Sequence, residues 1–156
     1  MSTRGCVAIG TATEWRGVYQ HFDSYPEDLG MRVWEMLKTE EGRTRYKSLI
    51  LNHPSGWSVF GETCYCHDPY FAKRDGSLDP KSEHYKENAP DGRMGQDTAD
   101  ALFIEWVYIL DEHEDGLDKL HILTSQPGEG KDADGFPKYV HRHVKTLIIG
   151  LDEWPY

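Results

Sequence analysis

The stretch from Trp15 to Gly30 limits the possible folds most, because it changes from a strand pattern to a helix start within a few residues. Its first half alternates β-prone aromatic residues with other residues, which is typical of a β-strand. Pro26 and the two acidic residues that follow it suit the first turn of a helix. The pattern therefore predicts a strand over 18–25 that leads directly into a helix over 26–39.

The remaining predicted elements are one more helix and four more strands. They are a strand over 5–12, a helix over 44–52 after a break at 40–42, and strands over 99–110, 119–124 and 139–151. The 99–110 run is apolar on both faces in strand register, so we expect Ala101 to Leu110 to be the most buried strand. The predicted fold class is α+β, with a mainly antiparallel sheet, the two helices of the first third packed on one face, and long loops.

The length of the chain fits one compact domain. The chain has 156 residues, of which 38% are hydrophobic, and this is enough to bury a core. We therefore expect a single domain over 1–156. Glycine and proline punctuate residues 53–95 without hydrophobic periodicity, which predicts a long irregular loop inside that domain.

Charge and cysteine content narrow the possible partners and the compartment. A net charge of −10 disfavours non-specific binding to nucleic acid or anionic lipid. The sequence shows neither a secretory signal at its start nor an apolar run of membrane-spanning length. An odd count of three cysteines argues against a disulfide framework, since Cys64 and Cys66 are also too close in sequence for an unstrained bond. These features predict a cytoplasmic protein with reduced thiols and no membrane partner.

The loop region contains a candidate zinc site. Thiolate and imidazole groups are ligands that zinc prefers, and Cys64, Cys66 and His67 lie close together, with His53 upstream. The spacing is C-x-C rather than C-x₂-C and no second cysteine pair exists, so a buried and inert pair of thiols is the alternative.

Two pairs of polar residues alternate along predicted strands. Asp23 could orient His21 as a general base, but the proline and the acidic first turn that follow favour the alternative, in which Asp23 or Ser24 caps the first helix. His141 and His143 would share a strand face, which suits either metal binding or a solvated surface.

Glu105 interrupts the apolar run of the 99–110 strand. If that strand is central, the carboxylate of Glu105 is buried and needs a cation, which Arg4 could supply; if it is an edge strand, Glu105 lies in water. The first reading predicts a concave site at the sheet end. Its residues would be Arg4, His21, Asp23 and Tyr25 on the wall and Glu105 on the floor.

Four stretches carry a resemblance to a known family. They are Arg4-Gly5, the HFDSYP motif that begins at His21, the CYCHDP motif that begins at Cys64, and LFIEWVYILD, which begins at Leu102. With them the chain resembles a family of small proteins from actinobacteria and their phages. The resemblance covers most of the chain and implies a phage or actinobacterial origin. It implies no reaction, cofactor or catalytic residue.

Two classes of function remain. The first is a phage or actinobacterial accessory protein that binds a protein or small ligand, with a host-interaction or anti-defence role. The second is a small hydrolase or transferase that uses His21 and Asp23 with Glu105 and Arg4. No P-loop, dinucleotide fingerprint, nucleophile elbow or H-E-x-x-H motif occurs, which favours binding. A flat aromatic surface would favour binding, and a closed pocket walled by the polar candidates would favour catalysis.

Overall fold

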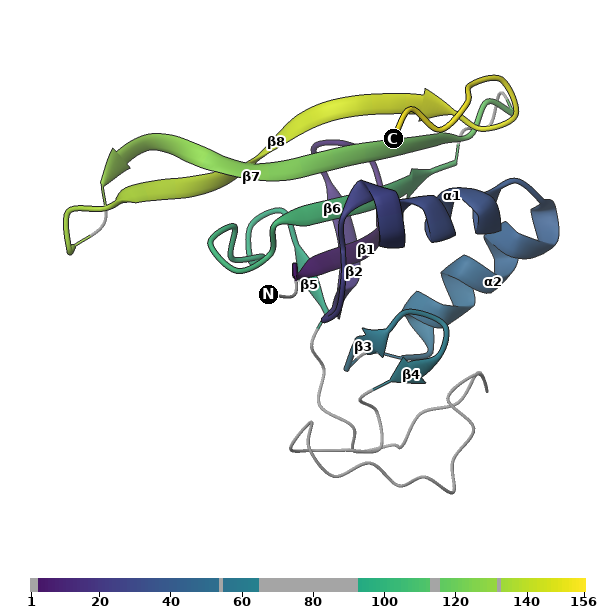
Figure 1. Cartoon of the computed structure of the whole chain (residues 1–156), viewed down its shortest axis with the longest axis horizontal. Helices are drawn as coiled ribbons and strands as arrows, with labels where there is room; N and C mark the ends of the chain where they lie inside the picture. Colours follow the sequence, from purple (N-terminus) through teal and green to yellow (C-terminus); the bar gives the residue numbers. More distant parts are fainter. Residues whose placement is uncertain (1–2, 54, 65–92, 113–115, 132) are drawn as a thin grey trace.

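The computed structural model describes residues 3–53, 55–64, 93–112, 116–131 and 133–156, with the backbone alone for 63 and 64. Within these ranges the chain forms a mixed β-sheet and two α-helices, so the predicted α+β class is confirmed. Figure 1 shows the helices together beside the sheet, and the last two strands as a long ribbon that extends past it.

The elements follow one another along the chain in this order: β1 (Gly5–Gly10), β2 (Trp15–Gln20), a π-helical turn η1 (Pro26–Gly30), α1 (Met31–Leu37), α2 (Glu40–Leu51), β3 (Trp57–Val59), β4 (Thr63–Cys64), β5 (Met94–Gly95), β6 (Trp106–Asp111), β7 (Lys119–Lys131) and β8 (Pro137–Ile148).

The sheet has the strand order β4-β3-β2-β1-β6-β7-β8, and β5 also pairs with β2. β1 runs parallel to β6 and β2 parallel to β3, whereas the other pairings in the described sheet are antiparallel. The prediction of a mainly antiparallel sheet is therefore only partly right. Parallel strands need a long crossover, and here the two helices and the long segment after them separate β1 from β6.

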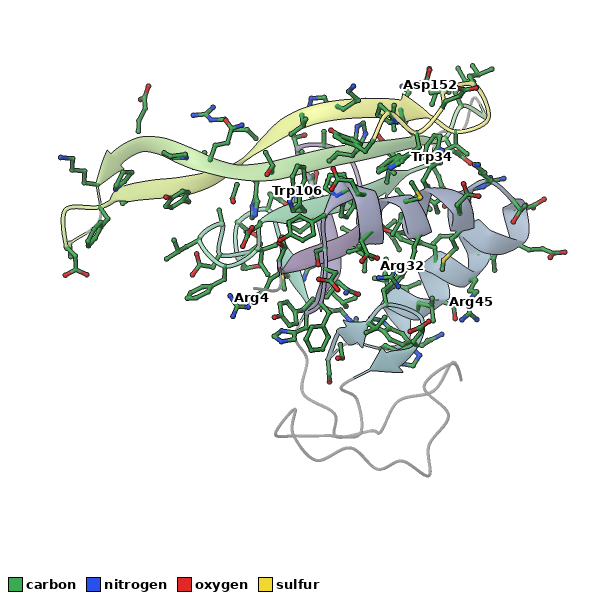
Figure 2. The ribbon with its side chains drawn as sticks, in the orientation of Figure 1. Arg4, Arg32, Trp34, Arg45, Trp106 and Asp152 are labelled. Carbon is green, nitrogen blue, oxygen red and sulfur yellow. The ribbon has the colours of Figure 1, made fainter. Side chains whose placement is uncertain are left out.

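The helices bury one face of the sheet. Trp34 and Leu37 of α1 and Leu49 of α2 pack with residues of β1, β2, β6 and β7 in one core cluster, and Trp34 lies between its helix and the sheet (Figure 2). The hydroxyl of Tyr46, fully buried on α2, accepts a hydrogen bond from the amide of Ala8 and has the carbonyl oxygen of Ala8 within 2.8 Å. This contact fixes α2 over the centre of the sheet.

A second, smaller core lies on the opposite face. Cys6, Val107 and Ile109 point to this side and are covered in part by Trp15 and Ile104. Burial raises the pKa of the Cys6 thiol far above its ordinary value, so this cysteine is an inert core residue.

The helix boundaries differ from the sequence prediction at the junction between α1 and α2. The expected break over 40–42 is wrong, because α2 begins at Glu40 and α1 ends at Leu37. Thr39 is extended, and its side chain accepts a hydrogen bond from the amide of Gly42. The N-cap therefore comes before the acidic residues that the sequence pattern suggested as the break.

The strand boundaries also differ from those predicted from the sequence. β1 stops at Gly10 and β2 starts at Trp15, so the strand predicted over 18–25 begins and ends earlier. The strand predicted over 99–110 begins only at Trp106.

Residues 99–105 instead form a turn, which we call the 99–105 turn. The Asp100 side chain accepts a hydrogen bond from the Leu102 amide, and the Asp100 carbonyl accepts from Phe103 and Ile104. An aspartate side chain stabilises such a turn by accepting a hydrogen bond from the backbone amide two residues further on. These local hydrogen bonds override the strand pattern of the sequence. The expected burial is confirmed for 107–110, which lies between β1 and β7.

β7 runs further than the predicted 119–124, whereas β8 starts two residues before and ends three residues before the predicted 139–151 strand. The sequence indicated a loop over 125–137, but the pairing continues to Lys131 opposite Pro137. Beyond Ser125, β7 pairs with β8 alone among the described strands. We call residues 126–131 and 137–140 the arm; it is the part of the ribbon that projects in Figure 1.

Candidate functional site

Three of the predicted site residues lie side by side at one end of the sheet. Gly5 pairs with Gln20 on one side and with Trp106 on the other, so the next residues outward are Arg4, His21 and Glu105. The amide of Glu105 donates a hydrogen bond of 2.9 Å to the Arg4 carbonyl. The sheet register therefore brings together residues that are far apart in sequence, and we call these three the strand-end cluster.

The imidazole of His21 is held by its neighbours. Its Nδ1 lies 2.5 Å from the Tyr19 hydroxyl, and its ring centre lies 4.5 Å from that of Phe22. Partial burial, and after it the positive charge of Arg4, lower the pKa of His21 from its ordinary value of 6.5. His21 is therefore a neutral imidazole near neutral pH, able to accept or donate a hydrogen bond.

Arg4 and Glu105 do not form the ion pair that a buried Glu105 would need. Glu105 is half-buried, and no ion pair joins it to Arg4 in the described part of the chain. Arg4 is exposed at the start of β1 (Figure 2), with its guanidinium carbon 5.9 Å from the ring centre of Phe103. The charge of Arg4 thus faces an aromatic ring and solvent.

Asp23 and Tyr25 are both exposed, beyond the end of β2. Neither Asp23 nor Ser24 caps the helical segment: its N-cap is Tyr25, without a side-chain hydrogen bond, and the Ser24 hydroxyl donates to the Gln20 carbonyl. The capping interpretation is therefore wrong. Asp23 has a φ of 48°, and its carbonyl accepts from the Leu29 amide, so its backbone makes the bend into η1.

A cleft separates the 99–105 turn from the arm. It has a volume of about 570 Å³ and is lined by Asp100 and Leu102 from the turn, by residues 137–139 from the arm and by Phe136 next to the arm. A second cleft of about 350 Å³ adjoins it at Tyr139 and reaches His141 and Trp15. Both clefts arise because the arm continues past the turn that covers the second core.

His141 fixes the turn against β8. Its Nε2–H donates a hydrogen bond of 2.7 Å to the Ile104 carbonyl, and its ring meets the Trp15 ring edge-on. Burial lowers the pKa of His141, while the bond to Ile104 and the charge of Asp100 oppose this shift. The side chain of His141 thus holds the 99–105 turn against β8.

Large apolar side chains remain exposed along the turn and the arm. Leu102 is 59% exposed, Phe103 53% and Phe136 66%. Arg4 lies over the Phe103 ring and its charge acts on His21, whose ring contacts that of Phe22. Leu102, Phe136 and Tyr139 line one cleft. We call this set of residues the aromatic stripe; its members are Arg4, Phe22, Leu102, Phe103, Phe136 and Tyr139.

The sequence reasoning did not identify most of the aromatic stripe. Leu102 and Phe103 belonged to a run that was predicted to be a buried strand, and Phe136 to a loop. One signal could have revealed the turn: Asp100 directly before the run is a residue that starts turns.

A polar chain on β6, β7 and β8 was also missed. His121 Nε2 lies 2.7 Å from the Asp111 carboxylate, and Thr146 lies within hydrogen-bond distance of both His121 and His143. The three strands are brought together by pairing alone, so no local spacing in the sequence indicates this chain. His141 and His143 have separate partners and do not act as a pair.

The predicted zinc ligands lie mostly outside the described residues. This holds for Cys66, for His67 and for the side chain of Cys64. His53 is buried, with its ring centre 4.5 Å from that of Trp57. Over the described ranges, no three histidine, cysteine or acidic side chains are grouped as a metal site. Structural zinc stays a prediction.

Comparison with known proteins adds no relative: no family model, curated protein or solved structure matches the chain. In the described segments, no helix has the length and apolar character to cross a membrane.

Proposed function

We propose that this chain is an interaction module that binds an extended segment of a partner protein along its aromatic stripe. In the setting implied by the sequence resemblance, it is an accessory protein of an actinobacterium or its phage. It acts in the cytoplasm of the bacterial cell, in host interaction or in evasion of host defence.

The single observation that carries the proposal is the exposure of the stripe. Soluble monomers rarely leave several large apolar side chains exposed side by side, and where they do, the surface commonly serves binding. Aromatic residues and arginine are also the residue types enriched in the energetically important part of protein interfaces. The stripe combines three phenylalanines, one leucine and one tyrosine with Arg4.

The shape of the stripe favours a polypeptide over a small molecule. Small-molecule sites enclose most of the ligand surface. Here Leu102 and Phe136, the most exposed apolar members of the stripe, both line an open cleft and are each more than half exposed. The stripe also includes Phe22, beyond the end of β2, which suits an extended chain that places side chains at several points.

Charge supports a protein partner as well. The net charge of −10 disfavours a nucleic-acid backbone. Asp100 and Lys138 form a polar rim of opposite charges around the cleft, as is usual at protein interfaces.

The hydrolase or transferase alternative at the strand-end cluster has less support. Asp23 makes no hydrogen bond to His21 among the described residues; the imidazole Nδ1 meets the Tyr19 hydroxyl instead, so the carboxylate that was expected to orient a general base does not contact it. Arg4 is directed to Phe103 and not to Glu105.

Selection from a library of short random peptides displayed on phage tests the proposal. Peptides are selected on the intact protein, and their binding is then measured by calorimetry against two variants. The double substitution Leu102→Ser and Phe136→Ser removes these two apolar side chains from the stripe, whereas Leu151→Ser is a matched control at a 71% exposed leucine elsewhere.

We expect a consensus sequence whose affinity falls about tenfold or more in the double variant, the loss typical of removing interface anchors. Leu151→Ser should bind like the unmodified protein. Peptides that bind all three proteins equally, or the absence of any consensus, would contradict the proposal.

A further inference from the structure

The polar chain on the last three strands lies apart from the aromatic stripe and has the arrangement of an activated hydroxyl. Asp111 ends β6, His121 lies on β7, and Thr146 lies opposite His121 on β8. The distances are 2.7 Å from Asp111 Oδ2 to His121 Nε2 and 2.8 Å from His121 Nδ1 to Thr146 Oγ1. Asp111 and His121 are buried, whereas Thr146 is half-buried and reachable from solvent.

The direction of each hydrogen bond follows from the chemistry of the groups. An ionised Asp111 can only accept, so His121 Nε2 carries the proton. In a neutral imidazole the other nitrogen is then an acceptor, so the Thr146 hydroxyl donates its proton to His121 Nδ1. Thr146 Oγ1 in turn accepts from Nε2 of the exposed His143, at 2.6 Å. The hydroxyl proton therefore points at a base whose orientation a carboxylate fixes.

We propose that Thr146 is the nucleophile of an acyl-transfer site, with His121 as its general base and Asp111 as the positioning carboxylate. A nucleophile, a base within hydrogen-bond reach and a third group that orients the base are the elements that covalent catalysis requires. The substrate class is carboxylic esters with a small acyl group, because Thr146 is only half-buried and lies on β8, the last strand in the order of the described sheet, where a small ester can reach it.

The reaction proceeds in two steps. Thr146 Oγ1 attacks the ester carbonyl carbon while its proton moves to His121 Nδ1; the bond to the leaving oxygen breaks, and His121 gives that proton to the departing alcohol. In the second step water attacks the acyl-threonine and passes a proton to His121. The bond between the acyl carbon and Oγ1 then breaks, Oγ1 takes the proton back, and the carboxylic acid is released. The net reaction is hydrolysis of one ester by one water molecule.

The test incubates the full chain briefly with p-nitrophenyl acetate. The release of nitrophenol gives the reaction rate, and the masses of the peptides after proteolysis show which residue carries an acetyl group. Thr146→Val keeps the shape of the side chain and removes the hydroxyl, and Thr146→Ser keeps the hydroxyl. Thr124→Val is the matched control, because Thr124 is also a half-buried threonine on this sheet but its hydroxyl donates to the Glu105 carbonyl.

We expect an acetyl group on Thr146 in the unsubstituted protein and in Thr124→Val, and on the serine at position 146 in Thr146→Ser. In Thr146→Val the rate should fall by about 100-fold, the size of a general-base-assisted step. An unmodified Thr146 in the unsubstituted protein, or equal rates for Thr146→Val and the control, would overturn the proposal. The hydrogen bonds among Asp111, His121 and Thr146 would then serve only to hold the strands together.

The role of Asp111 has a separate readout. In Asp111→Asn the side-chain amide can donate to His121 Nε2, which moves the imidazole proton to Nδ1 and prevents Nδ1 from accepting the hydroxyl proton. Acylation should be lost at neutral pH and return with rising pH, because hydroxide can then take the Thr146 proton in place of His121, whereas Asp111→Glu should restore part of the acylation at neutral pH. A loss of thermal stability in Asp111→Asn with an unchanged pH profile would refute the positioning role.

Discussion

The guanidinium carbon of Arg4 lies 5.9 Å from the ring centre of Phe103, and this contact connects the strand-end cluster to the 99–105 turn. Through this contact, Arg4 before β1, His21 after β2 and the turn before β6 form one surface. Arg4 therefore acts on two neighbours, as the charge beside His21 and as the cation over Phe103.

The first prediction concerns the pKa of His21. In a titration followed by NMR, His21 should have a pKa below 6.5, and Arg4→Gln should raise it because a positive charge is removed. Arg45→Gln is the control, since Arg45 is an exposed arginine on α2, away from Arg4 (Figure 2). A His21 pKa that responds equally to both substitutions would show that Arg4 is not the local cause.

The same shift has a consequence for stability. Because the folded state lowers the pKa of His21, the unfolded state binds more protons just below pH 6.5. The contribution of His21 to stability is therefore present above pH 6.5 and is lost as the pH falls through the pKa of the folded state. His141, whose pKa is also lowered, acts in the same direction. Urea unfolding should show the free energy of unfolding decreasing from pH 7 towards pH 5, and less steeply in Arg4→Gln.

The second prediction concerns the backbone at Asp23, which has a φ of 48°. A β-branched residue is strained there, so Asp23→Val should lower the free energy of unfolding by about 1–2 kcal/mol, whereas Asp23→Gly should leave it unchanged or raise it. Thermal unfolding measures both. An equal loss in the two variants would mean that the carboxylate, and not the backbone bend, contributes the stability.

The third prediction uses the close packing at Gly30. Alanine is usually favoured over glycine in a helix, but a Cβ at Gly30 would lie 2.7 Å from Trp154 and 2.9 Å from Tyr108. Gly30→Ala should therefore destabilise the protein by about 1–3 kcal/mol. Trp154 stacks on Trp34 and donates to the Pro26 carbonyl, so Trp154→Ala is destabilising by itself.

A double-mutant cycle separates the two effects. Gly30→Ala should cost less in the Trp154→Ala background than in the unmodified protein, because one of its two clashing rings is gone. Additive losses would contradict the packing of the C-terminal segment against the start of α1.

The fourth prediction concerns the anchoring of α2. Tyr46→Phe removes the hydroxyl that bonds to Ala8 and should lower the free energy of unfolding by about 1–3 kcal/mol, since the groups involved are buried. Tyr25→Phe, at an exposed tyrosine, is the matched control and should change it little. Equal stability of both variants would show that the buried hydroxyl contributes nothing to the docking of α2.

Some of the fold follows from the sequence, because periodicity reports which residues are buried. The α+β class, the two helices and the burial of 107–110 were predicted in this way. The start of β6 was not, because the bonds that Asp100 makes to its own turn compete with the strand pattern and leave Leu102 and Phe103 exposed. The parallel pairing of β1 with β6 depends on contacts across the whole chain and leaves no local signal.

The candidate sites show the same division. The short connection between the first two predicted strands indicated an antiparallel pair, and β1 and β2 form that pair, which sets Arg4 beside His21 in register. The expected Asp23 cap was wrong, because Asp23 adopts a left-handed backbone that makes the bend itself. The aromatic stripe depends on the extension of β7, which continues through Pro127, Gly128 and Gly130, and the contact of His121 with Thr146 depends on the register between β7 and β8.

Hydrogen–deuterium exchange of the protein with and without a saturating selected peptide tests the binding proposal most directly. If a partner segment lies along the aromatic stripe, the amides of 100–104 and 136–140 should exchange more slowly in the complex, while those of 43–51 on α2 should be unchanged. Protection confined to α2 or to the end of β8 near Leu151, with the turn and the arm unaffected, would contradict the account.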